Sequence, residues 1–170
     1  MNFFVIQVRT GGENHYLRLT RKYIEERDIE LLWPRRALTI RKKGKKIKSL
    51  APIFPGYIFL KSETFPQDLF RPLKSARGFT RFLENNERIK PLAGPDRGLL
   101  LHFLSFGEIT AKSKVTFDEN NRIVVAEGPL KGLEGSIIKV DKRKGRAKVR
   151  LDLYKDSFLV DLGFDIMEAK

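Results

Sequence analysis

The apolar residues of the first thirty positions follow a strand period and then a helix period. Residues 3–9 alternate, with Phe4, Ile6 and Val8 on one side of the chain. A period of two is typical of a β-strand, here one with a fully apolar face. A Gly-Gly pair ends the alternation, and in residues 13–28 the apolar side chains recur at helical spacing. We therefore expect a strand followed by an amphipathic helix.

The next thirty residues predict a hairpin between two strands. Residues 30–33 form a short strand candidate that a proline ends. Residues 37–40 and 47–50 flank a basic segment that contains Gly44, which predicts a β-hairpin with that glycine at its tip. The run 53–60 is apolar without alternation. This composition favours a central strand that is covered on both faces.

A short helix, a strand and a longer helix complete the first part of the chain. Residues 66–74 predict a helix that Pro72 interrupts, and residues 79–83 predict a strand. Residues 96–106 predict a helix that its first residue, an aspartate, can cap. Together these elements predict an α+β domain over residues 1–108, with an antiparallel sheet and flanking helices.

The rest of the chain predicts a linker and a small all-β domain. Residues 109–121 lack apolar periodicity and are rich in Thr, Lys, Ser, Asp and Asn, which is typical of a flexible linker. Residues 122–170 contain short strand candidates separated by turn-forming clusters, and this pattern favours a small β-barrel. The strand candidates are residues 123–126, 136–140, 147–153, 158–162 and 166–167.

Charge adds a class of partner to this picture. The chain carries a net charge of +13, and residues 1–110 hold 21 Lys and Arg against 11 Asp and Glu, which places +10 in that part. A basic excess concentrated in one domain is the expected footprint of a protein that binds nucleic acid. A solvated basic surface without a dedicated partner is the alternative.

Composition excludes several other classes of protein. The absence of Cys excludes disulfides and thiolate zinc sites, and with only two His we expect no metal and no cofactor. No apolar run reaches the ~20 residues that span a bilayer, and the first residues do not resemble a signal peptide. We therefore expect a cytoplasmic, monomeric protein that binds no membrane. No grouping of Ser, His and carboxylate residues indicates catalysis, so we do not expect an enzyme.

Two segments resemble one family of proteins. Residues 52–60 read PIFPGYIFL and are similar to the Phe-Pro-Gly-Tyr strand entry in the N-terminal domain of NusG-like transcription factors. Residues 124–141 read VVAEGPLKGLEGSIIKVD and look like a KOW motif, whose glycines permit positive φ at tight turns. The first strand departs from the family pattern, because Phe3-Phe4 stands where the family usually has Trp-Tyr.

The resemblance implies a protein that binds RNA polymerase. In the family, the N-terminal (NGN-like) domain grips the coiled coil of the polymerase clamp through an aromatic pocket. The matching residues here are Phe4, Phe54, Tyr57 and Phe59. We expect Phe54 or Tyr57 to line an apolar depression on the domain surface, and packing in the core is the alternative for both. The C-terminal KOW domain of the family can recruit a ribosomal protein or the termination factor Rho.

The resemblance also implies contact with nucleic acid, and two groups of basic residues could make it. The hairpin group is Arg41, Lys42, Lys43, Lys45 and Lys46. The second group lies around the first strand and the first two helices and comprises Arg9, His15, Arg18, Lys22, Lys74 and Arg77. Positions that match Arg9 and Arg77 read non-template DNA in one specialised branch of the family. LoaP-type members instead use a basic N-terminal domain to recognise an RNA hairpin.

We therefore expect a transcription elongation factor that suppresses pausing and termination, most similar to the LoaP-type members. Both an RNA hairpin and non-template DNA are candidate ligands. A general NusG factor is one alternative, and it would lack strong binding to free nucleic acid. The other alternative is a KOW-containing ribosomal or RNA-assembly protein, which would not bind polymerase.

Overall fold

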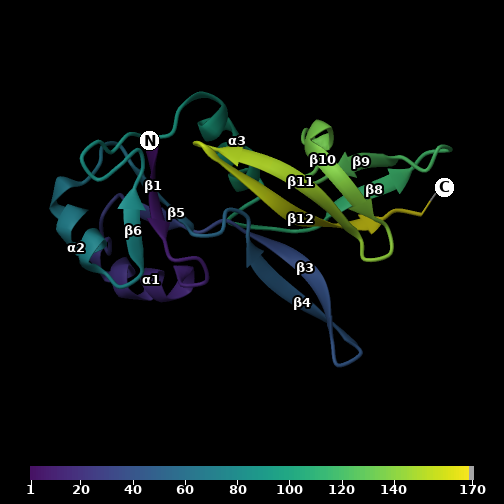
Figure 1. Ribbon diagram of the computed structural model, residues 1–170, viewed down its shortest axis with the longest axis horizontal. Coiled ribbons are helices and arrows are strands. Elements are labelled where there is room, and N and C mark those ends of the chain that lie inside the picture. The colour runs from purple at the N-terminus through teal and green to yellow at the C-terminus, as the bar shows by residue number, and fades with distance from the viewer. Residues whose placement is uncertain (169–170) are drawn as a thin grey trace. The chain divides into compact units, whose positions relative to one another are not determined.

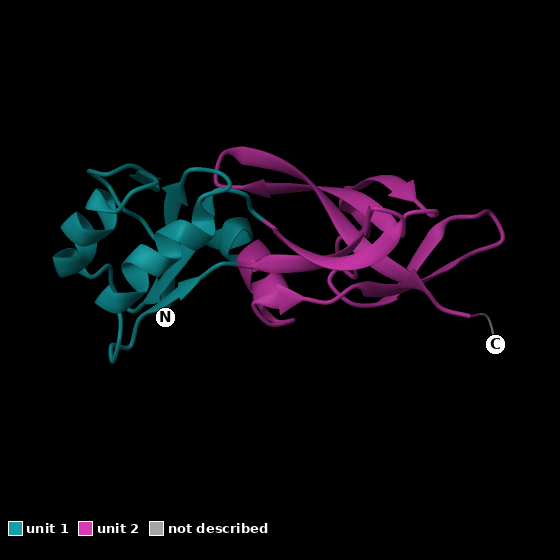
Figure 2. Cartoon of the chain, turned by 90° about the horizontal axis from the view of Figure 1, so that it is seen from below, with its two compact units in different colours: residues 1–33, 54–97 teal, residues 34–53, 98–170 magenta. Residues whose placement is uncertain are grey.

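The computed structural model describes residues 1–168 and divides the chain into two compact units (Figures 1 and 2). Unit 1 comprises residues 1–33 and 54–97, and unit 2 comprises residues 34–53 and 98–170. The predicted hairpin therefore belongs to the unit that contains the C-terminal strands. Within the described residues, no helix combines the length and the apolar character needed to cross a membrane.

Unit 1 is built on a four-stranded sheet in the order β2-β5-β1-β6. Its strands are β1 (Asn2–Val8), β2 (Glu30–Leu32), β5 (Tyr57–Ser62) and β6 (Phe79–Phe82). The central pair, β1 and β5, is antiparallel and places Ile6 opposite Ile58. The predicted central strand is thus confirmed as β5. The first strand also buries both faces, because Phe3 and Val5 are as inaccessible as Phe4.

The helices of unit 1 are shorter than the sequence pattern predicts. They are α1 (Glu13–Thr20), which continues as a 3-10 turn at Arg21–Tyr23, and α2 (Phe70–Ser75), which follows a 3-10 turn at Gln67–Leu69. The Thr20 hydroxyl donates to the carbonyl of Tyr16 at 2.8 Å, where the α-helical part ends. Pro72 does not interrupt α2, because a proline is tolerated in the first turn of a helix. The Tyr16 hydroxyl joins the two helices by donating to the carbonyl of Leu73 at 2.7 Å.

A long hairpin begins unit 2. Its strands are β3 (Arg35–Lys42) and β4 (Lys45–Pro52), and β7 (Ile109–Thr110) adds a third strand in the order β4-β3-β7. Lys43 and Gly44 form the two-residue turn with φ values of +52° and +76°. Positive φ at both positions is the pattern of a type I′ turn, whose twist matches that of the strands. The predicted position of Gly44 at the tip is confirmed.

A five-stranded sheet in the order β10-β11-β12-β8-β9 forms the rest of unit 2. Its strands, which we call the C-terminal sheet, are β8 (Ser113–Phe117), β9 (Ile123–Glu127), β10 (Ile137–Asp141), β11 (Arg146–Leu153) and β12 (Asp156–Ile166). β11 buries every second residue, namely Ala147, Val149, Leu151 and Leu153. The helix α3 (Gly94–Leu104) precedes this sheet and crosses the boundary between the units.

Two sequence predictions about the C-terminal part need correction, although the predicted mixed fold class is confirmed. The segment predicted as a linker, residues 109–121, contains β7 and β8. Only Val115 supplies a buried apolar side chain in β8, so the pattern looked polar, and pairing with β9 and β12 makes the strand. The segment 166–167 is not a separate strand, since β12 runs on to Ile166.

Gly128 of the KOW-like segment packs closely against β8, so a side chain at this position should destabilise the fold. Its φ is +106°, and a Cβ there would lie 2.5 Å from the Cα of Ser113. Gly128→Ala should therefore lower the free energy of unfolding by about 2–4 kcal/mol through backbone strain and overpacking. Gly135→Ala is the matched control, because a Cβ at Gly135 meets nothing within 4 Å. Equal denaturant midpoints for the two variants would contradict this account.

Candidate nucleic-acid interface

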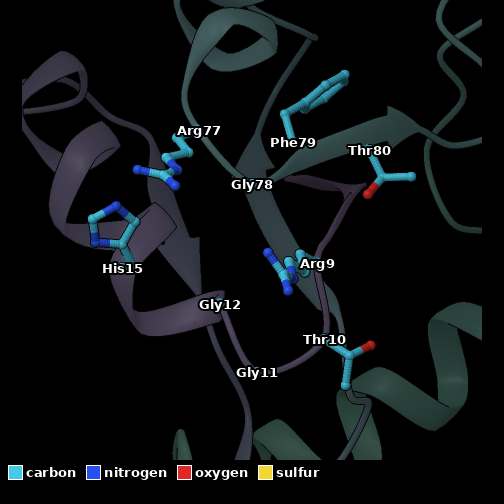
Figure 3. Close-up of a pocket in the computed structure, with 9 residues that line it drawn as sticks. All are labelled: Arg9, Thr10, Gly11, Gly12, His15, Arg77, Gly78, Phe79 and Thr80. Atoms are coloured by element: carbon cyan, nitrogen blue, oxygen red, sulfur yellow. The ribbon is translucent and has the colours of Figure 1, made fainter.

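Unit 1 carries an open depression of about 680 Å³ at the end of β1, the start of α1 and the start of β6 (Figure 3). Residues 9–12, His15 and residues 77–80 line it. Among these described residues none is acidic, whereas Arg9, His15 and Arg77 are basic. The depression therefore has the electrostatic character of an anion-binding surface.

Backbone hydrogen bonds bring the two arginines together from distant parts of the chain. The N–H of Arg9 donates to the carbonyl of Gly78 at 2.8 Å, directly after Arg77. The N–H of Gly12 donates to the carbonyl of Arg9 at 2.9 Å and closes the turn into α1. In Figure 3 the Arg77 side chain points toward His15, and the Arg9 guanidinium lies apart from these two side chains, beneath Gly78.

The start of α1 adds backbone donors to the same depression. The preceding residue, Gly12, provides no side-chain cap. The first N–H groups of a helix have no partner within the helix, and they mark the positive end of its dipole. Such a helix start, lined by cationic side chains, is a chemically suitable place for a phosphate group.

The structure brings together only part of the predicted basic set. Arg9, His15 and Arg77 line the depression, whereas Arg18, Lys22 and Lys74 are exposed elsewhere on unit 1. The Lys22 ammonium lies 5.2 Å from the ring of Tyr23, and that of Lys74 lies 5.5 Å from the ring of Phe70. The hairpin group is exposed too but belongs to unit 2; it consists of Arg41, Lys42, Lys43, Lys45 and Lys46.

The sequence analysis did not predict that Phe79 and Thr80 belong to the depression. Phe79 is half-buried at the start of β6, and Thr80 is exposed beside it. An aromatic ring next to cationic groups can stack on a nucleotide base, and a threonine hydroxyl can donate to a phosphate. Gly78 was the only local signal, because it is a turn residue directly before Phe79 begins β6.

The aromatic residues predicted for polymerase binding are in the core. Phe4, Phe54, Tyr57 and Phe59 have exposed fractions of 4%, 1%, 2% and 0%. The rings of Phe54 and Phe59 meet edge to face with their centroids 5.7 Å apart. The expectation that Phe54 or Tyr57 lines an open apolar depression is therefore wrong for this structure. A role of these residues in polymerase binding stays a prediction.

The Phe54–Tyr57 turn is nevertheless tied to the cationic depression. The N–H of Tyr57 donates to the carbonyl of Phe54 at 3.0 Å, and Gly56 has a φ of +84°, which is the pattern of a type II turn after a proline. The carbonyl of Gly56 accepts from the N–H of Val8 at 2.7 Å. The N–H of Gly56 donates to the buried carboxylate of Glu13 at 3.2 Å. The turn thus fixes both the end of β1 and the start of α1.

No group of three or more His, Asp or Glu side chains that could hold a metal ion occurs in residues 1–168. The depression therefore offers cationic and backbone N–H groups rather than metal ligands. Its cationic side chains and backbone N–H groups suit the binding of an anion.

Comparison with known proteins identifies a family. Residues 1–97 match the family model described as "Transcription termination factor nusG". The chain is 25% identical to the Transcription termination/antitermination protein NusG of Pasteurella multocida, over 98% of this chain and 93% of that protein. It is 24% identical to the protein of the same name from Thermus thermophilus, over 83% of this chain and 80% of that one.

A solved structure has the same fold. The chain from the study titled "Domain interaction in Thermotoga maritima NusG" superposes with a TM-score of 0.56, over 95% of this chain and 93% of that chain. The two sequences are 19% identical, so this likeness concerns the fold.

The buried Glu13 carboxylate should stabilise the backbone around the depression, because it accepts from the N–H of Gly56. Glu13→Ala leaves the N–H of Gly56 without its acceptor and should lower the free energy of unfolding by about 1–3 kcal/mol. Glu13→Gln keeps an acceptor at that position and should lose less. Glu87→Ala, at an exposed position of unit 1, is the control. A denaturant titration in which Glu13→Ala and Glu87→Ala unfold together would refute the role given to this carboxylate.

Proposed function

Because the chain belongs to the NusG family, we propose that it is a transcription elongation and antitermination factor that binds both RNA polymerase and nucleic acid. Its relatives are transcription termination/antitermination proteins and not enzymes. One observation carries the nucleic-acid part of the proposal: Arg9, His15 and Arg77, from three different segments, line one depression without an acidic residue.

The polymerase-binding part concerns the turn that the buried aromatic residues support. We propose that unit 1 binds the coiled coil of the polymerase clamp, as the family resemblance implies. The rings of Phe4, Phe54, Tyr57 and Phe59 are buried, so their contribution is to hold the turn in shape. Pro55 is only half-buried at that turn and is available for direct contact.

The chemistry of the depression suits a phosphate backbone with an accessible base. A guanidinium can hold a phosphate or a guanine edge through two hydrogen bonds, which an ammonium cannot do in a fixed geometry. Phe79 supplies a ring for stacking at the same place. An RNA hairpin loop and the displaced non-template DNA strand both offer unstacked bases beside phosphates. We propose one of these as the ligand, in the manner of LoaP-type members.

The proposed action is occupancy rather than chemistry. A protein that holds the clamp and an adjacent nucleic-acid strand at once disfavours clamp opening, and with it pausing and termination. The C-terminal sheet, whose β9 and β10 carry the KOW-like segment, is the proposed site for a ribosomal protein or Rho. Tethering to polymerase would present this second partner at a high effective concentration.

The first rival function is a general NusG factor. The names of the relatives favour it, because they describe proteins of that general type. A general factor would show little binding to free nucleic acid, whereas the proposed one binds it in the absence of polymerase. The second rival, a KOW-containing ribosomal protein, is disfavoured because the family match lies over residues 1–97 and not over the KOW-like segment.

Arg77 is the residue whose replacement tests the proposal. Arg77→Ala should weaken binding to an RNA hairpin or to single-stranded non-template DNA, and it should reduce the slope of log K against log salt by about 0.7–0.9 for each phosphate that the variant no longer neutralises. Gel-shift titrations over a series of salt concentrations measure both quantities. Readthrough of a terminator by purified polymerase should fall in the same variant.

Arg88→Ala is the matched control, since Arg88 is an exposed arginine of unit 1 outside the depression. It should leave the salt slope and the readthrough unchanged. Parallel log–log lines for the parent protein and Arg77→Ala would remove the depression from the nucleic-acid interface. A parent protein that binds no free nucleic acid but still binds polymerase would favour the general NusG factor.

A further inference from the structure

We propose that the β3–β4 hairpin and the β10–β11 turn form one composite cationic surface, the hairpin–turn surface, which binds a nucleic-acid phosphate backbone. Its members are Arg41, Lys42, Lys43, Lys45, Lys46 and Lys48 of the hairpin and Lys142, Arg143 and Lys144 of the turn. This inference rests on the nucleic-acid binding proposed above. It goes further by giving the C-terminal sheet a direct contact with nucleic acid, in addition to any recruitment of proteins.

The hairpin carries a continuous run of positive charge. Each strand has eight residues, so the hairpin is about 26 Å long at ~3.3 Å per residue. Every residue from Arg41 to Lys48 is exposed, and residues 31–62 contain no Asp or Glu. The type I′ turn at Lys43 and Gly44 holds the tip in a defined twist.

The strand register places like charges directly opposite one another. Arg41 lies opposite Lys46, and Lys42 lies opposite Lys45. Directly opposed like charges destabilise a pair of strands, so this arrangement has no benefit for folding. None of the ion pairs formed within residues 1–168 involves a cation of the hairpin–turn surface. An external polyanion would relieve the repulsion.

The β10–β11 turn continues this charge from the C-terminal sheet. Lys142, Arg143 and Lys144 are exposed, and the turn is closed by a bond from the N–H of Lys144 to the Asp141 carboxylate at 2.9 Å. The Lys142 ammonium lies 4.4 Å from the ring centroid of Phe117 and donates to the Asn121 side-chain oxygen at 3.2 Å, and both partners are uncharged. On the adjoining strands Lys139 lies opposite Lys148, which extends the positive face.

Contacts between β3 and the C-terminal sheet bring the two runs of cations together. The Arg146 guanidinium donates to the carbonyl of Thr39 at 2.9 Å. The Arg36 guanidinium donates to the carbonyl of Asp161 at 2.6 Å, and burial lowers the pKa of Arg36 to about 10, so it remains charged at neutral pH. Gly163 packs against the same strand, since a Cβ there would lie 3.3 Å from the carbonyl oxygen of Ala37.

The Arg146–Thr39 hydrogen bond also limits how far apart the two runs can be. Arg41 is two residues from Thr39, and Lys144 is two residues from Arg146. Two extended residues span about 7 Å, and the extended Arg146 side chain with its hydrogen bond adds about 12 Å, so the Cα atoms of Arg41 and Lys144 lie within about 26 Å. That length corresponds to about eight phosphates of one DNA strand. Figure 1 shows the hairpin and the β10–β11 turn projecting from the same side of unit 2.

The composition of the surface favours nucleic acid over an acidic protein. Seven of its nine cations are lysines, and lysine is depleted in protein–protein interfaces. The hairpin presents its ammonium groups without a carboxylate among them, and such groups bind phosphates as point charges, whereas the turn includes the Asp141 carboxylate that accepts from the N–H of Lys144. The ligand class is therefore a phosphate backbone, either of duplex DNA or of an RNA stem.

The test compares three double variants of the full chain. Arg143→Ala/Lys144→Ala removes two cations from the turn, and Lys42→Gln/Lys45→Gln removes two from the hairpin. Lys131→Ala/Lys155→Ala is the control, because it removes two exposed cations of the C-terminal part that lie outside the surface. Binding is measured by fluorescence anisotropy over a salt series, with a DNA duplex and an RNA stem of about 20 base pairs, roughly two helical turns. Melting curves confirm that all variants are folded.

The proposal predicts that the turn and hairpin variants each bind at least about fivefold more weakly near 0.1 M salt and have a shallower salt slope, while the control matches the parent. A larger effect with one probe identifies whether DNA or RNA is the ligand. A turn variant that binds like the parent, while Arg77→Ala is impaired, would overturn this inference and leave the proposed function intact. The affinity of the same variants for polyglutamate, an acidic polypeptide, is measured for comparison. Turn and hairpin variants that lose affinity for polyglutamate but not for nucleic acid would also overturn the inference. A parent that binds neither the duplex nor the stem would overturn this inference, whereas the proposed function fails only if the parent also binds neither an RNA hairpin nor single-stranded DNA.

Discussion

The close approach of Gly56 to the end of β1 is the constraint on which the rest of unit 1 depends. A Cβ at Gly56 would lie 3.0 Å from the carbonyl oxygen of Val8, so only glycine fits there without displacement. This approach lets Gly56 bond to Val8 on one side and to the Glu13 carboxylate on the other. The loop between Val8 and Glu13 carries Arg9 and leads into α1. The buried aromatic turn and the cationic depression are therefore parts of one local structure.

The positive charge of the chain is divided between two places with different physical character. The depression of unit 1 combines guanidinium groups with backbone N–H groups and one aromatic ring, which suits a specific contact with a phosphate and a base. The hairpin of unit 2 consists mainly of exposed lysines on a two-stranded ribbon, which suits affinity without sequence preference. In the proposed function, the first property would serve to recognise a site and the second would keep the protein in contact with nucleic acid as the sequence changes.

The sequence predicted what local patterns encode. The apolar run of β5, the glycine at the hairpin tip and the α+β class followed from periodicity and turn chemistry, and Arg9 and Arg77 followed from the family resemblance. Long-range packing was not predictable, because the bond between Arg36 and Asp161 that joins the hairpin to the C-terminal sheet leaves no local pattern. Burial of Phe54 was equally invisible, because an aromatic residue beside a turn has the same sequence pattern in a core as at a surface.

The central claim is that the depression of unit 1 touches nucleic acid while the protein is bound to polymerase. The most direct measurement places a photoreactive residue at Thr80, an exposed residue of the depression, and maps its crosslinks in a transcribing polymerase complex. The same label at Lys155, an exposed residue of unit 2, serves as the reference. We predict that the protein is retained on the complex and that Thr80 crosslinks to non-template DNA or nascent RNA. Retention on polymerase with crosslinks from Thr80 to protein alone would contradict the account.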